Sequence, residues 1–560
     1  MKFIEFHSEK CDECFKCLRF CPTKAIAFTR EKRHIVDDLC IKCGQCLVQC
    51  KQGALTIYKD TSRIKTMIAS HQKVAVSLAP SFAGVFQMNT PGQMATALAQ
   101  IGFDIVEETA RGAEIVSKAY DEVIKSSHMK NIITSCCTSS MYLLQHNYGK
   151  STDTAIPVVS PMIAHGRDMK ARYGNVYTVF IGPCIAKKAE ATEFDDAIDA
   201  VMTFKELEEW FDESNIQLTG LESGAFDTPA TKRGRAFPVG GSLDVEGTYQ
   251  YLHLEGIDEC KSFLDAVESD EITGFCAELN ICAGGCLNGP EIPLQSPSNF
   301  SRMEKLLKYV KKTDSEEHDV EIPEIEIERD FKDMTYVNQP VDENQVYNVL
   351  MDMEKYTEQD QINCGACGYS SCYEKAIAVV KGYSDSDMCL DRLKHKVESL
   401  QSIIFDNSPN AICILDEEQR IQEINPSFNK IFNEDKIKLD DWPIHAVIGH
   451  DIFEVLRLPD ENSISQKLYL ESVDKIFFIN LLKIHDSKTY VGIFTDITYE
   501  EQSIEEMNHM KSKTLDTVQE VIENQMRVAQ EIASLLGETT AETKIGLNKL
   551  RDIVLGEEGR

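Results

Sequence analysis

Short apolar runs separated by helical patterns dominate the middle of this 560-residue chain. Val74–Leu78, Asn131–Thr134 and Val176–Ile181 each read as a buried strand. Each run leads into a loop that carries cysteine or proline. Strands that alternate with helices predict an α/β domain over residues 68–310, with a site built at the ends of its strands.

The pattern differs on both sides of this domain. Residues 1–62 hold a duplicated cysteine-rich unit, and residues 311–345 are acidic, dotted with proline, and predict a linker. A small domain is expected around the last cysteines, over residues 346–395. Beyond it, residues 398–500 predict a hairpin, a helix that starts at Asn425-Pro426 and two late strands. The expected strands are Ala411–Leu415, Ile421–Ile424, Ile476–Leu482 and Tyr490–Thr495.

The last segment, residues 501–560, is polar and predicted to be helical. Apolar residues recur there at alternating steps of three and four, with one polar position among them: Leu515, Val518, Ile522, Gln525, Ala529, Ile532 and Leu536. This spacing favours a coiled-coil seam through which two chains could pair. An amphipathic helix packed on the preceding domain fits the pattern equally well.

Charge and targeting signals limit the partners and the cellular compartment expected for the chain. The chain has 58 basic and 91 acidic residues, a net charge of −33, which argues against nucleic acid and anionic membranes as partners. Met1 to Lys10 carries charges and no apolar segment, and no run of about twenty apolar residues follows. With free CxxC pairs, these features predict a cytoplasmic protein.

Cysteine grouping is the strongest chemical signal. Four sets account for most of the twenty cysteines: Cys11, Cys14, Cys17 and Cys21; Cys40, Cys43, Cys46 and Cys50; Cys137, Cys184, Cys282 and Cys286; Cys364, Cys367, Cys372 and Cys389. Four thiolates select an iron–sulfur cluster or zinc. A chain with several such groups is expected to transfer electrons.

The first two sets, each CxxCxxCxxxC, resemble the bacterial two-cluster ferredoxin, in which the fourth cysteine of each run ligates the other cluster. By that resemblance, Cys50 completes the cluster of Cys11, Cys14 and Cys17, and Cys21 completes that of Cys40, Cys43 and Cys46. A pair of zinc knuckles is the alternative, but zinc sites rarely use this spacing.

The third set lies in three ordered motifs: TSCC (134–137), GPCIAKKAE (182–190) and ELNICAGGCLNG (278–289). They resemble the H-cluster signatures of [FeFe]-hydrogenases, and the resemblance covers residues 1–310. It implies a [4Fe–4S] cluster on the third set, joined through Cys286 to a two-iron subsite that carries CO, CN⁻ and an azadithiolate.

The resemblance also assigns roles around that subsite. Lys187 would donate to cyanide, and Ala79-Pro80-Ser81 would give a backbone N–H and a hydroxyl. Phe237 and the pair Gly240-Gly241 match a turn where backbone approaches the group closely. Cys136 holds the place of a thiol that passes a proton. The alternatives are a spare buried thiol for Cys136 and a solvated surface lysine for Lys187.

Several positions depart from the family. Thr138-Ser139-Ser140 replaces Pro and Trp, and Gly182 and Asn280 replace methionines, which predicts a wall without methionine. Glu108 matches a proton-carrying glutamate, but Arg111 stands where a second acid is expected. We therefore expect slow turnover limited by proton transfer. A wall without methionine is the pattern of sensory members of the family.

The fourth cysteine set and the region after it also resemble known domains. The fourth set, in NCGACGYSSC, resembles a small [4Fe–4S] module appended to redox enzymes, with zinc as the alternative. Residues 398–500 resemble a PAS domain, which binds a small ligand, dimerises or passes signals into a following helix. The fold expected is a multidomain α+β and α/β protein: a two-cluster ferredoxin domain, a two-lobed α/β H-cluster domain, a small Fe–S domain, a PAS domain and a C-terminal helix.

The function predicted is an iron-only hydrogenase that senses H₂ or redox poise. Its expected partners are H₂ and protons, a ferredoxin or another redox protein, a separate signalling kinase or phosphatase, and a second copy of the chain. One alternative is a ferredoxin-coupled catalytic hydrogenase with a regulatory PAS domain. Another is a cluster-binding relative that never receives the two-iron subsite.

Overall fold

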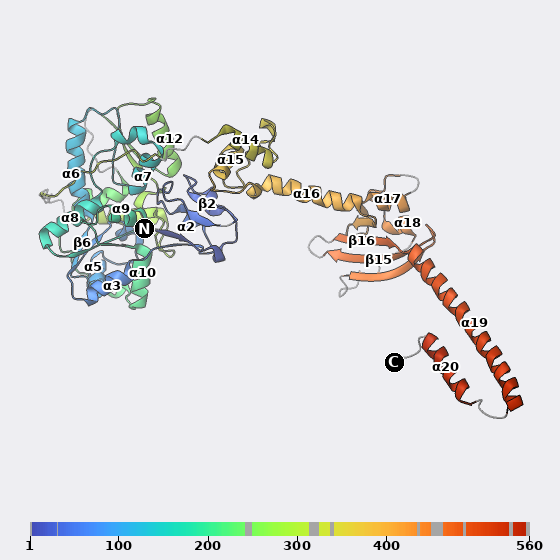
Figure 1. Ribbon diagram of the computed structural model, residues 1–560. Coiled ribbons are helices and arrows are strands. Elements are labelled where there is room, and N and C mark those ends of the chain that lie inside the picture. Colours follow the sequence, from blue (N-terminus) through green and yellow to red (C-terminus); the bar gives the residue numbers. More distant parts are fainter. Residues whose placement is uncertain are drawn as a thin grey trace. The chain divides into compact units, whose positions relative to one another are not determined.

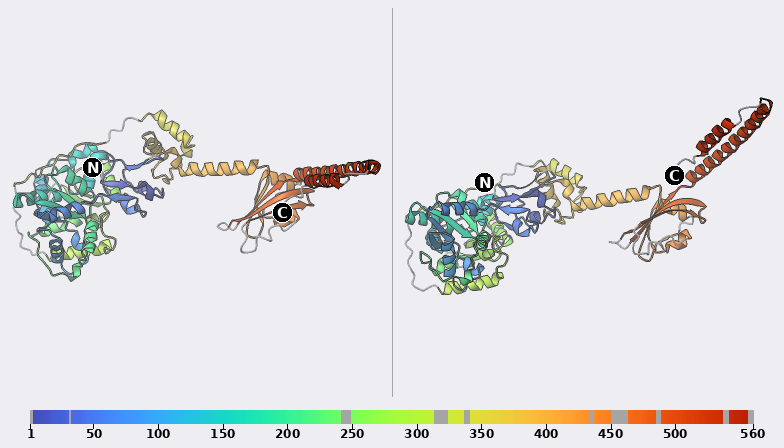
Figure 2. Two further views of the ribbon diagram at one scale, coloured as in Figure 1. Left: turned by 60° about the horizontal axis from the view of Figure 1, so that its bottom comes forward. Right: turned by 90° about the horizontal axis from the view of Figure 1, so that it is seen from below.

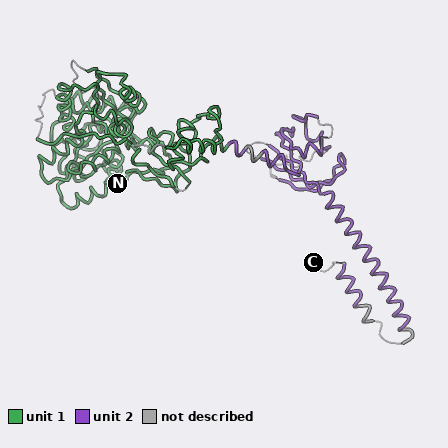
Figure 3. Tube along the Cα trace, turned by 45° about the horizontal axis from the view of Figure 1, so that its top comes forward, with its two compact units in different colours: residues 1–393 green, residues 394–560 purple. Residues whose placement is uncertain are grey.

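The computed structural model of the chain divides into two compact units, Met1–Leu393 and Lys394–Arg560 (Figure 3). Each unit is considered separately below. The residues that the structure describes are 3–30, 32–240, 249–312, 324–335, 341–433, 437–449, 463–484, 489–536 and 541–555.

A four-stranded parallel sheet forms the first lobe of the large α/β domain (Figure 1). Its strands, in spatial order, are β6 (Ile105–Glu108), β5 (Val74–Leu78), β8 (Tyr177–Gly182) and β9 (Ala200–Thr203). The principal helices of this lobe are α5 (Gly92–Gln100), α6 (Ala110–Ser126), α8 (Pro161–Tyr173), α9 (Ala186–Glu193) and α10 (Phe204–Glu213). The strand predicted at Val74–Leu78 is confirmed, and the strand predicted at Val176–Ile181 lies one residue later.

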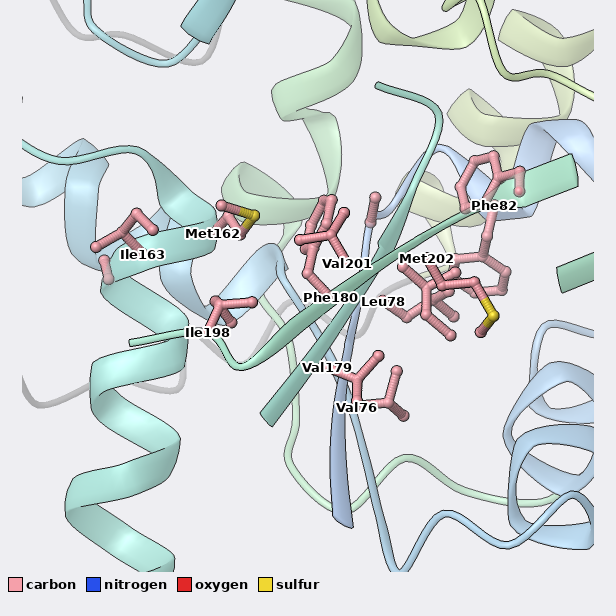
Figure 4. Packing of buried hydrophobic residues seen from close by; sticks show 14 of the residues in the cluster. Val76, Leu78, Phe82, Met162, Ile163, Val179, Phe180, Ile198, Val201 and Met202 are labelled. Carbon is pink, nitrogen blue, oxygen red and sulfur yellow. The ribbon is translucent and has the colours of Figure 1, made fainter. Parts of the chain in front are cut away.

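The core of this lobe explains why most positions of β5, β8 and β9 are apolar. Val76, Val179 and Val201 come from neighbouring strands and are almost completely buried, as is Ile163 of α8 (Figure 4). Helices on the two faces leave no strand face for water, so alternation of polar residues is lost. Burial of each such side chain stabilises the fold by about 1.5–3 kcal/mol.

A smaller parallel sheet forms the second lobe. Its strands, in spatial order, are β10 (Gln250–Glu255), β11 (Phe275–Asn280) and β7 (Ile132–Ile133). Helices α7 (Thr138–Asn147) and α12 (Ile257–Glu268) pack against this sheet. Helices α11 (Lys232–Ala236) and α13 (Asn299–Lys311) instead contact α6 and α4 (Phe82–Val85) of the first lobe. The strand predicted at Asn131–Thr134 is present but short, because the chain turns into a cysteine loop directly after it.

Two cysteine-rich modules belong to the same unit. The N-terminal one contains β1 (Ile4–Phe6), α1 (Lys16–Arg19), β2 (Ile26–Phe28), β3 (Arg33–Ile35), α2 (Gln45–Gln49) and β4 (Leu55–Ile57). The late one contains α14 (Glu343–Asp352) and α15 (Cys372–Val380). Tyr369 of the late module packs into the core around Leu18, and the Phe28 N–H donates to the Tyr383 carbonyl at 2.8 Å. The two modules therefore share one interface.

Part of the segment predicted as a linker is packed. Residues 324–335 lie along the large domain, where the Val159 N–H donates to the Ile327 carbonyl at 2.9 Å and the Arg329 N–H to the Pro157 carbonyl at 3.1 Å. Phe331 is buried in the core of the second lobe. The segment was predicted as a linker because acidic residues surround the few apolar and cationic side chains that attach it to the large domain. Residues 313–323 and 336–340 of the predicted linker lie outside the described residues.

The second unit contains a five-stranded antiparallel sheet. Its strands, in spatial order, are β13 (Ile421–Ile424), β12 (Ala411–Leu415), β16 (Thr489–Asp496), β15 (Lys475–Ile484) and β14 (Ser463–Leu470). Helices α17 (Pro426–Phe432) and α18 (Ile444–Ile448) accompany it. The predicted hairpin is confirmed, but β14 was missed because its apolar residues alternate with Ser, Gln and Lys and only Leu470 is buried.

Helices enter and leave this sheet. Helix α16 (Leu390–Asn407) precedes it, and α19 (Thr498–Leu536) follows it for 39 residues. Helix α20 (Ala541–Leu555) folds back along α19 (Figures 1 and 2). Among the predicted seam residues, Leu515 and Ile522 are half-buried and Val518 is exposed. None of the described helices combines the length and apolar character needed to cross a membrane.

Candidate active site

The carboxyl ends of strands from both lobes converge on one cavity. Strands β5 and β8 lead into the loops of Pro80 and Cys184, and β7 and β11 lead into those of Cys136 and Cys282. The cavity has a volume of about 100 Å³ and is lined by the cysteines Cys136, Cys137, Cys184 and Cys286. Three loops far apart in sequence thus deliver thiols to one place, and the loop after β5 adds Pro80 and Ser81.

The fourth cysteine of the scattered set, Cys282, lies beside the others. Burial and the nearby thiolates of Cys184, Cys137 and Cys286 raise its pKa well above the usual range. Burial likewise raises the pKa of Cys184 to about 11. Thiols that share a buried site without enough positive charge resist ionisation, and a bound metal centre would supply that charge.

Ser81 presents a polar group that has no protein partner. Its side chain is completely buried at the cavity wall, and its Oγ makes no hydrogen bond within the described structure. A buried hydroxyl without a partner costs about 1–3 kcal/mol. Ser81 therefore fits a bound group with hydrogen-bond acceptors, and Pro80 lines the wall beside it.

Much of the remaining wall is apolar. Phe180, Phe237, Pro238 and Met162 all line the cavity. The expectation of a wall without methionine is therefore wrong: Gly182 and Asn280 lack the thioether, but Met162 reaches the cavity from α8. An apolar wall excludes water and strengthens electrostatic interactions inside it.

Lys187 belongs to a buried ionic network at the cavity. Its Nζ lies 2.6 Å from a carboxylate oxygen of Glu190 and 3.4 Å from the Cys136 carbonyl. The Glu190 carboxylate also accepts hydrogen bonds from Thr138 at 2.8 Å and Ser160 at 2.9 Å. Arg329 of the packed segment donates to the other oxygen at 2.9 Å. Despite burial, these cations hold the pKa of Glu190 below its usual value.

Cys136 lines the cavity next to the scattered set. Its Sγ lies 3.7 Å from the Thr134 hydroxyl. Burial raises the pKa of the Cys136 thiol well above its usual range, and the negative charge of Glu278 raises it further. The thiol is thus kept protonated, which suits a group that holds a proton and passes it on.

The structure describes only part of the predicted glycine turn. Gly240 has φ +70°, and a side chain there would meet the His253 ring at 2.6 Å, so the backbone approaches this imidazole closely. His253 in turn lies 2.9 Å from the Asn280 amide, which lines the cavity. Gly241 lies outside the described residues.

Glu108 takes a different position from the other predicted residues. It is buried at the end of β6 but is not part of the cavity wall. Its carboxylate pairs with the Arg235 guanidinium and accepts a hydrogen bond from the Tyr309 hydroxyl at 2.7 Å. Arg111, expected in place of a second acid, pairs with Asp168 at 2.6 Å. Both residues are held in ion pairs.

The other three cysteine sets surround smaller cavities of similar size. Each has a volume of about 20 Å³. One is lined by Cys11, Cys14, Cys17 and Cys50, and one by Cys21, Cys40, Cys43 and Cys46. The third is lined by Cys364, Cys367, Cys372 and Cys389. The structure therefore brings each fourth N-terminal cysteine to the opposite run, the arrangement expected from the ferredoxin resemblance.

Sequence reasoning missed several residues of the site. Glu190 could have been predicted from the sequence, because it lies one helical turn after Lys187 and side chains at this spacing contact each other. Arg329 comes from about 140 residues later along the chain, and no local pattern links it to Glu190. Thr109 and Glu278 line the cavity from strand ends. Their positions depend on sheet order, which the sequence does not reveal.

Matches to known families follow the same architecture. Residues 72–246 match the family described as iron only hydrogenase large subunit, C-terminal domain. Residues 3–51 match the 4Fe-4S dicluster domain, residues 360–390 a putative Fe-S cluster family and residues 398–467 the PAS domain. The chain therefore contains a domain similar to the large subunit of iron-only hydrogenases. It joins the hydrogenase domain to iron–sulfur modules and a PAS domain.

Individual relatives are distant. The chain is 26% identical over 280 residues to the NADP-reducing hydrogenase subunit HndD of Solidesulfovibrio fructosivorans, covering 42% of this chain and 48% of that protein. It is 24% identical over 319 residues to iron hydrogenase 1 of Clostridium pasteurianum, covering 45% and 56%. The chain therefore spans about half the length of these relatives. A solved variant of HydA1 from Chlamydomonas reinhardtii is 18% identical with a TM-score of 0.39, covering 44% of this chain and 88% of that one.

Proposed function

We propose that the chain is a sensory [FeFe]-hydrogenase, which interconverts H₂ with protons and electrons and passes the resulting signal through its PAS domain. The observation that carries this proposal is the central cavity, where the scattered cysteines, the Cys136 thiol and an unpartnered buried hydroxyl meet. Its volume of about 100 Å³ is several times the volume of about 20 Å³ of each cavity that a complete set of four cysteines surrounds elsewhere. A site for a four-iron cluster plus a further group fits this difference.

The cavity residues suit a group that carries CO and CN⁻. When bound, the H-cluster would supply the cleavage of H₂ into protons and electrons. Cys137, Cys184, Cys282 and Cys286 would hold it, with Ser81 and Lys187 donating hydrogen bonds to its acceptor atoms. The Cys136 thiol would hold and pass the proton, and the apolar wall of Met162 and Phe237 would exclude water.

The remaining cysteine sets would hold [4Fe–4S] clusters that supply a path for electrons. Ile41 of the N-terminal module is buried in one core with Ala186, and Cys43 and Cys184 both pack against that core. The late module shares the core around Leu18 on the same N-terminal module. We infer an order of late set, N-terminal sets and central cavity, with a ferredoxin or another redox protein as external partner.

A sensory role is supported by the proton side of the site. Glu108 is held by Arg235 and Tyr309, so it is poorly suited to carry protons rapidly. Slow turnover would let the redox state of the chain report H₂ without consuming it. The signal would then reach a separate kinase or phosphatase through the PAS domain, its ligand if it has one, and a homodimer formed by the PAS domain and helix.

Infrared spectroscopy of the matured protein tests the proposal. We expect the bands of CO and CN⁻ bound to iron, H₂ turnover well below that of catalytic relatives, and a partner kinase whose activity changes with H₂. Absence of these bands would leave the chain as a cluster-binding relative and overturn the proposal. Fast turnover with a partner insensitive to H₂ would instead indicate a ferredoxin-coupled catalytic enzyme.

A further inference from the structure

A continuous line of buried polar groups leads from the central cavity toward the protein surface. The Thr109 hydroxyl, at the cavity wall, lies 2.7 Å from the Ser77 hydroxyl. Ser77 Oγ lies 2.8 Å from His165 Nδ1, and His165 Nε2 lies 2.9 Å from Glu107 Oε2. The Tyr173 hydroxyl donates to the other oxygen of Glu107 at 2.5 Å.

The fold explains why these groups meet. Ser77 on β5 and Glu107 on β6 are paired neighbours in the parallel sheet, and His165 reaches both from α8. Ser77, His165 and Glu107 are completely buried, whereas Tyr173 is partly exposed at the end of α8. The line therefore starts at the cavity and ends near solvent.

The charges around His165 fix the direction of the hydrogen bonds. Despite burial, hydrogen bonds from Arg172, His165 and Tyr173 hold the pKa of Glu107 well below its usual range, so its carboxylate only accepts. His165 Nε2–H must then donate to Glu107, and in the neutral ring Nδ1 accepts from Ser77. The other charges packed here, Asp168 with Arg111 and Arg172, complete the cluster.

We propose that the line Thr109–Ser77–His165–Glu107–Tyr173 carries protons between the central cavity and solvent. In H₂ oxidation a proton from the cavity would bind Thr109 Oγ1, which releases its own proton to Ser77. Ser77 would protonate His165 Nδ1 while Nε2–H passes to Glu107. Glu107 would then protonate the Tyr173 oxygen as that phenol releases its own proton to water. One proton enters and one leaves, with no electron transferred along the line.

This inference rests on the proposed function, which requires protons to cross the buried wall. Every member of the line can both give and take a proton in the required sequence. Glu107, like Glu108, is held in an ion pair, in this case by Arg172, but its carboxylate also meets His165 of the line. Transfer to the strongly stabilised Glu107 carboxylate is unfavourable, which agrees with the slow turnover proposed above.

Substitutions at the cavity end separate proton transfer from packing. Thr109→Val keeps the shape but removes the hydroxyl, and Thr109→Ser keeps the hydroxyl. His165→Gln preserves both hydrogen bonds but cannot pass a proton readily. Asp168→Asn is the matched control, because it changes the same charged cluster without interrupting the line. CO and CN⁻ bands and iron content would be measured first in each matured variant.

With those bands intact, Thr109→Val and His165→Gln should slow H₂ oxidation at least about tenfold and increase its solvent isotope effect. Thr109→Ser and Asp168→Asn should stay within about twofold. Unchanged turnover in Thr109→Val would overturn the route. If the unsubstituted protein lacks the bands, the proposed function fails and the route fails with it.

A second readout does not depend on the cofactor. Nitrogen-15 NMR of the histidine-labelled, unmatured chain should show His165, assigned with the His165→Gln variant, protonated at Nε2 and accepting at Nδ1. Ser77→Ala should shift the Nδ1 resonance and leave Nε2 protonated. A His165 protonated at Nδ1 alone would contradict the direction of the line and overturn the proposal.

Discussion

Arg329 holds Glu190 across about 140 residues of sequence: its Nη1 donates to Glu190 Oε1 at 2.9 Å, and both side chains are buried. Glu190 in turn holds Lys187 at the central cavity. The Arg329 guanidinium also lies over the ring of Phe331 at 4.7 Å. The segment that precedes the late iron–sulfur module is thereby tied to the wall of the site.

Replacement of Arg329 by methionine should weaken this tie. Glu190 would keep Lys187 but lose its second cation, and we expect a loss of about 2 kcal/mol in the free energy of unfolding. Thermal unfolding of the full chain, followed by cysteine accessibility at the cavity, measures it. The control is Lys308→Met, which removes an exposed pair with Glu304 and should leave the melting temperature nearly unchanged. Equal melting temperatures for the two variants would contradict the expectation.

Local pattern was sufficient for those elements whose burial is uniform. The strands at Val74–Leu78 and Ala411–Leu415 were predicted with their observed bounds, because apolar runs and flanking turn residues leave few alternatives. Strand β14 was missed, since one side of it faces water and its apolar residues read as isolated. Residues 324–335 were missed as a packed segment because acidic residues surround the anchors Arg329 and Phe331.

The candidate site, like the fold, could be predicted only where the local sequence pattern determines it. Motif order pointed to cysteines that the structure brings together, since each motif ends a strand and such ends converge. The partners of the predicted residues could not be read in this way. Arg235, which pairs with Glu108, and His165, which meets Ser77, depend on how helices cross the sheet. Met162 shows the same limit, because a methionine lost from one motif does not prevent another element from supplying one.

The crossed cysteine arrangement makes a spectroscopic prediction. Cys21 lies with Cys46 around one cavity, although it belongs to the first run. Cys21→Ala should therefore lose the same reduced-cluster signal as Cys46→Ala, with about four fewer iron atoms per chain, and Cys17→Ala should lose a different one. Electron paramagnetic resonance and iron analysis of reconstituted protein measure this. Loss of one common signal in Cys21→Ala and Cys17→Ala would refute the arrangement.

Cys136 and Cys276 offer a matched comparison of two thiols. Both have a pKa raised by burial, but Cys136 lines the cavity and Cys276 lies inside β11. Cys136→Ala should reduce H₂ turnover at least about a hundredfold, because a proton carrier is lost from the cavity. Cys276→Ala should lower the melting temperature and keep turnover within about twofold. Similar turnover in both variants would remove Cys136 from the proposed function.

The contact between the late module and the N-terminal module can be probed at one glycine. Gly368 has φ +96°, and a Cβ there would lie 2.7 Å from the Leu18 side chain. Gly382 has φ +73° but open space around it. Gly382→Ala should cost about 1 kcal/mol from backbone strain alone, and Gly368→Ala about 2 kcal/mol or more. Hydrogen exchange of residues 16–19 measures the difference, and equal exchange in both variants would argue against a tight contact.

Asn425 joins three parts of the PAS domain through one completely buried side chain. Its Oδ1 accepts from the backbone N–H of Ile412 at 2.8 Å and Phe428 at 2.9 Å, and its Nδ2 donates to the Phe405 carbonyl of α16 at 3.1 Å. Asn425→Ala would leave these buried groups without partners, at a cost of about 2 kcal/mol, so the amides of β12 should exchange about thirtyfold faster. Lys430→Ala, an exposed change on α17, is the control and should leave exchange unchanged. If Asn425→Ala also left β12 protected, the entering helix would not depend on this side chain, and a signal passing between α16 and the sheet would need another contact.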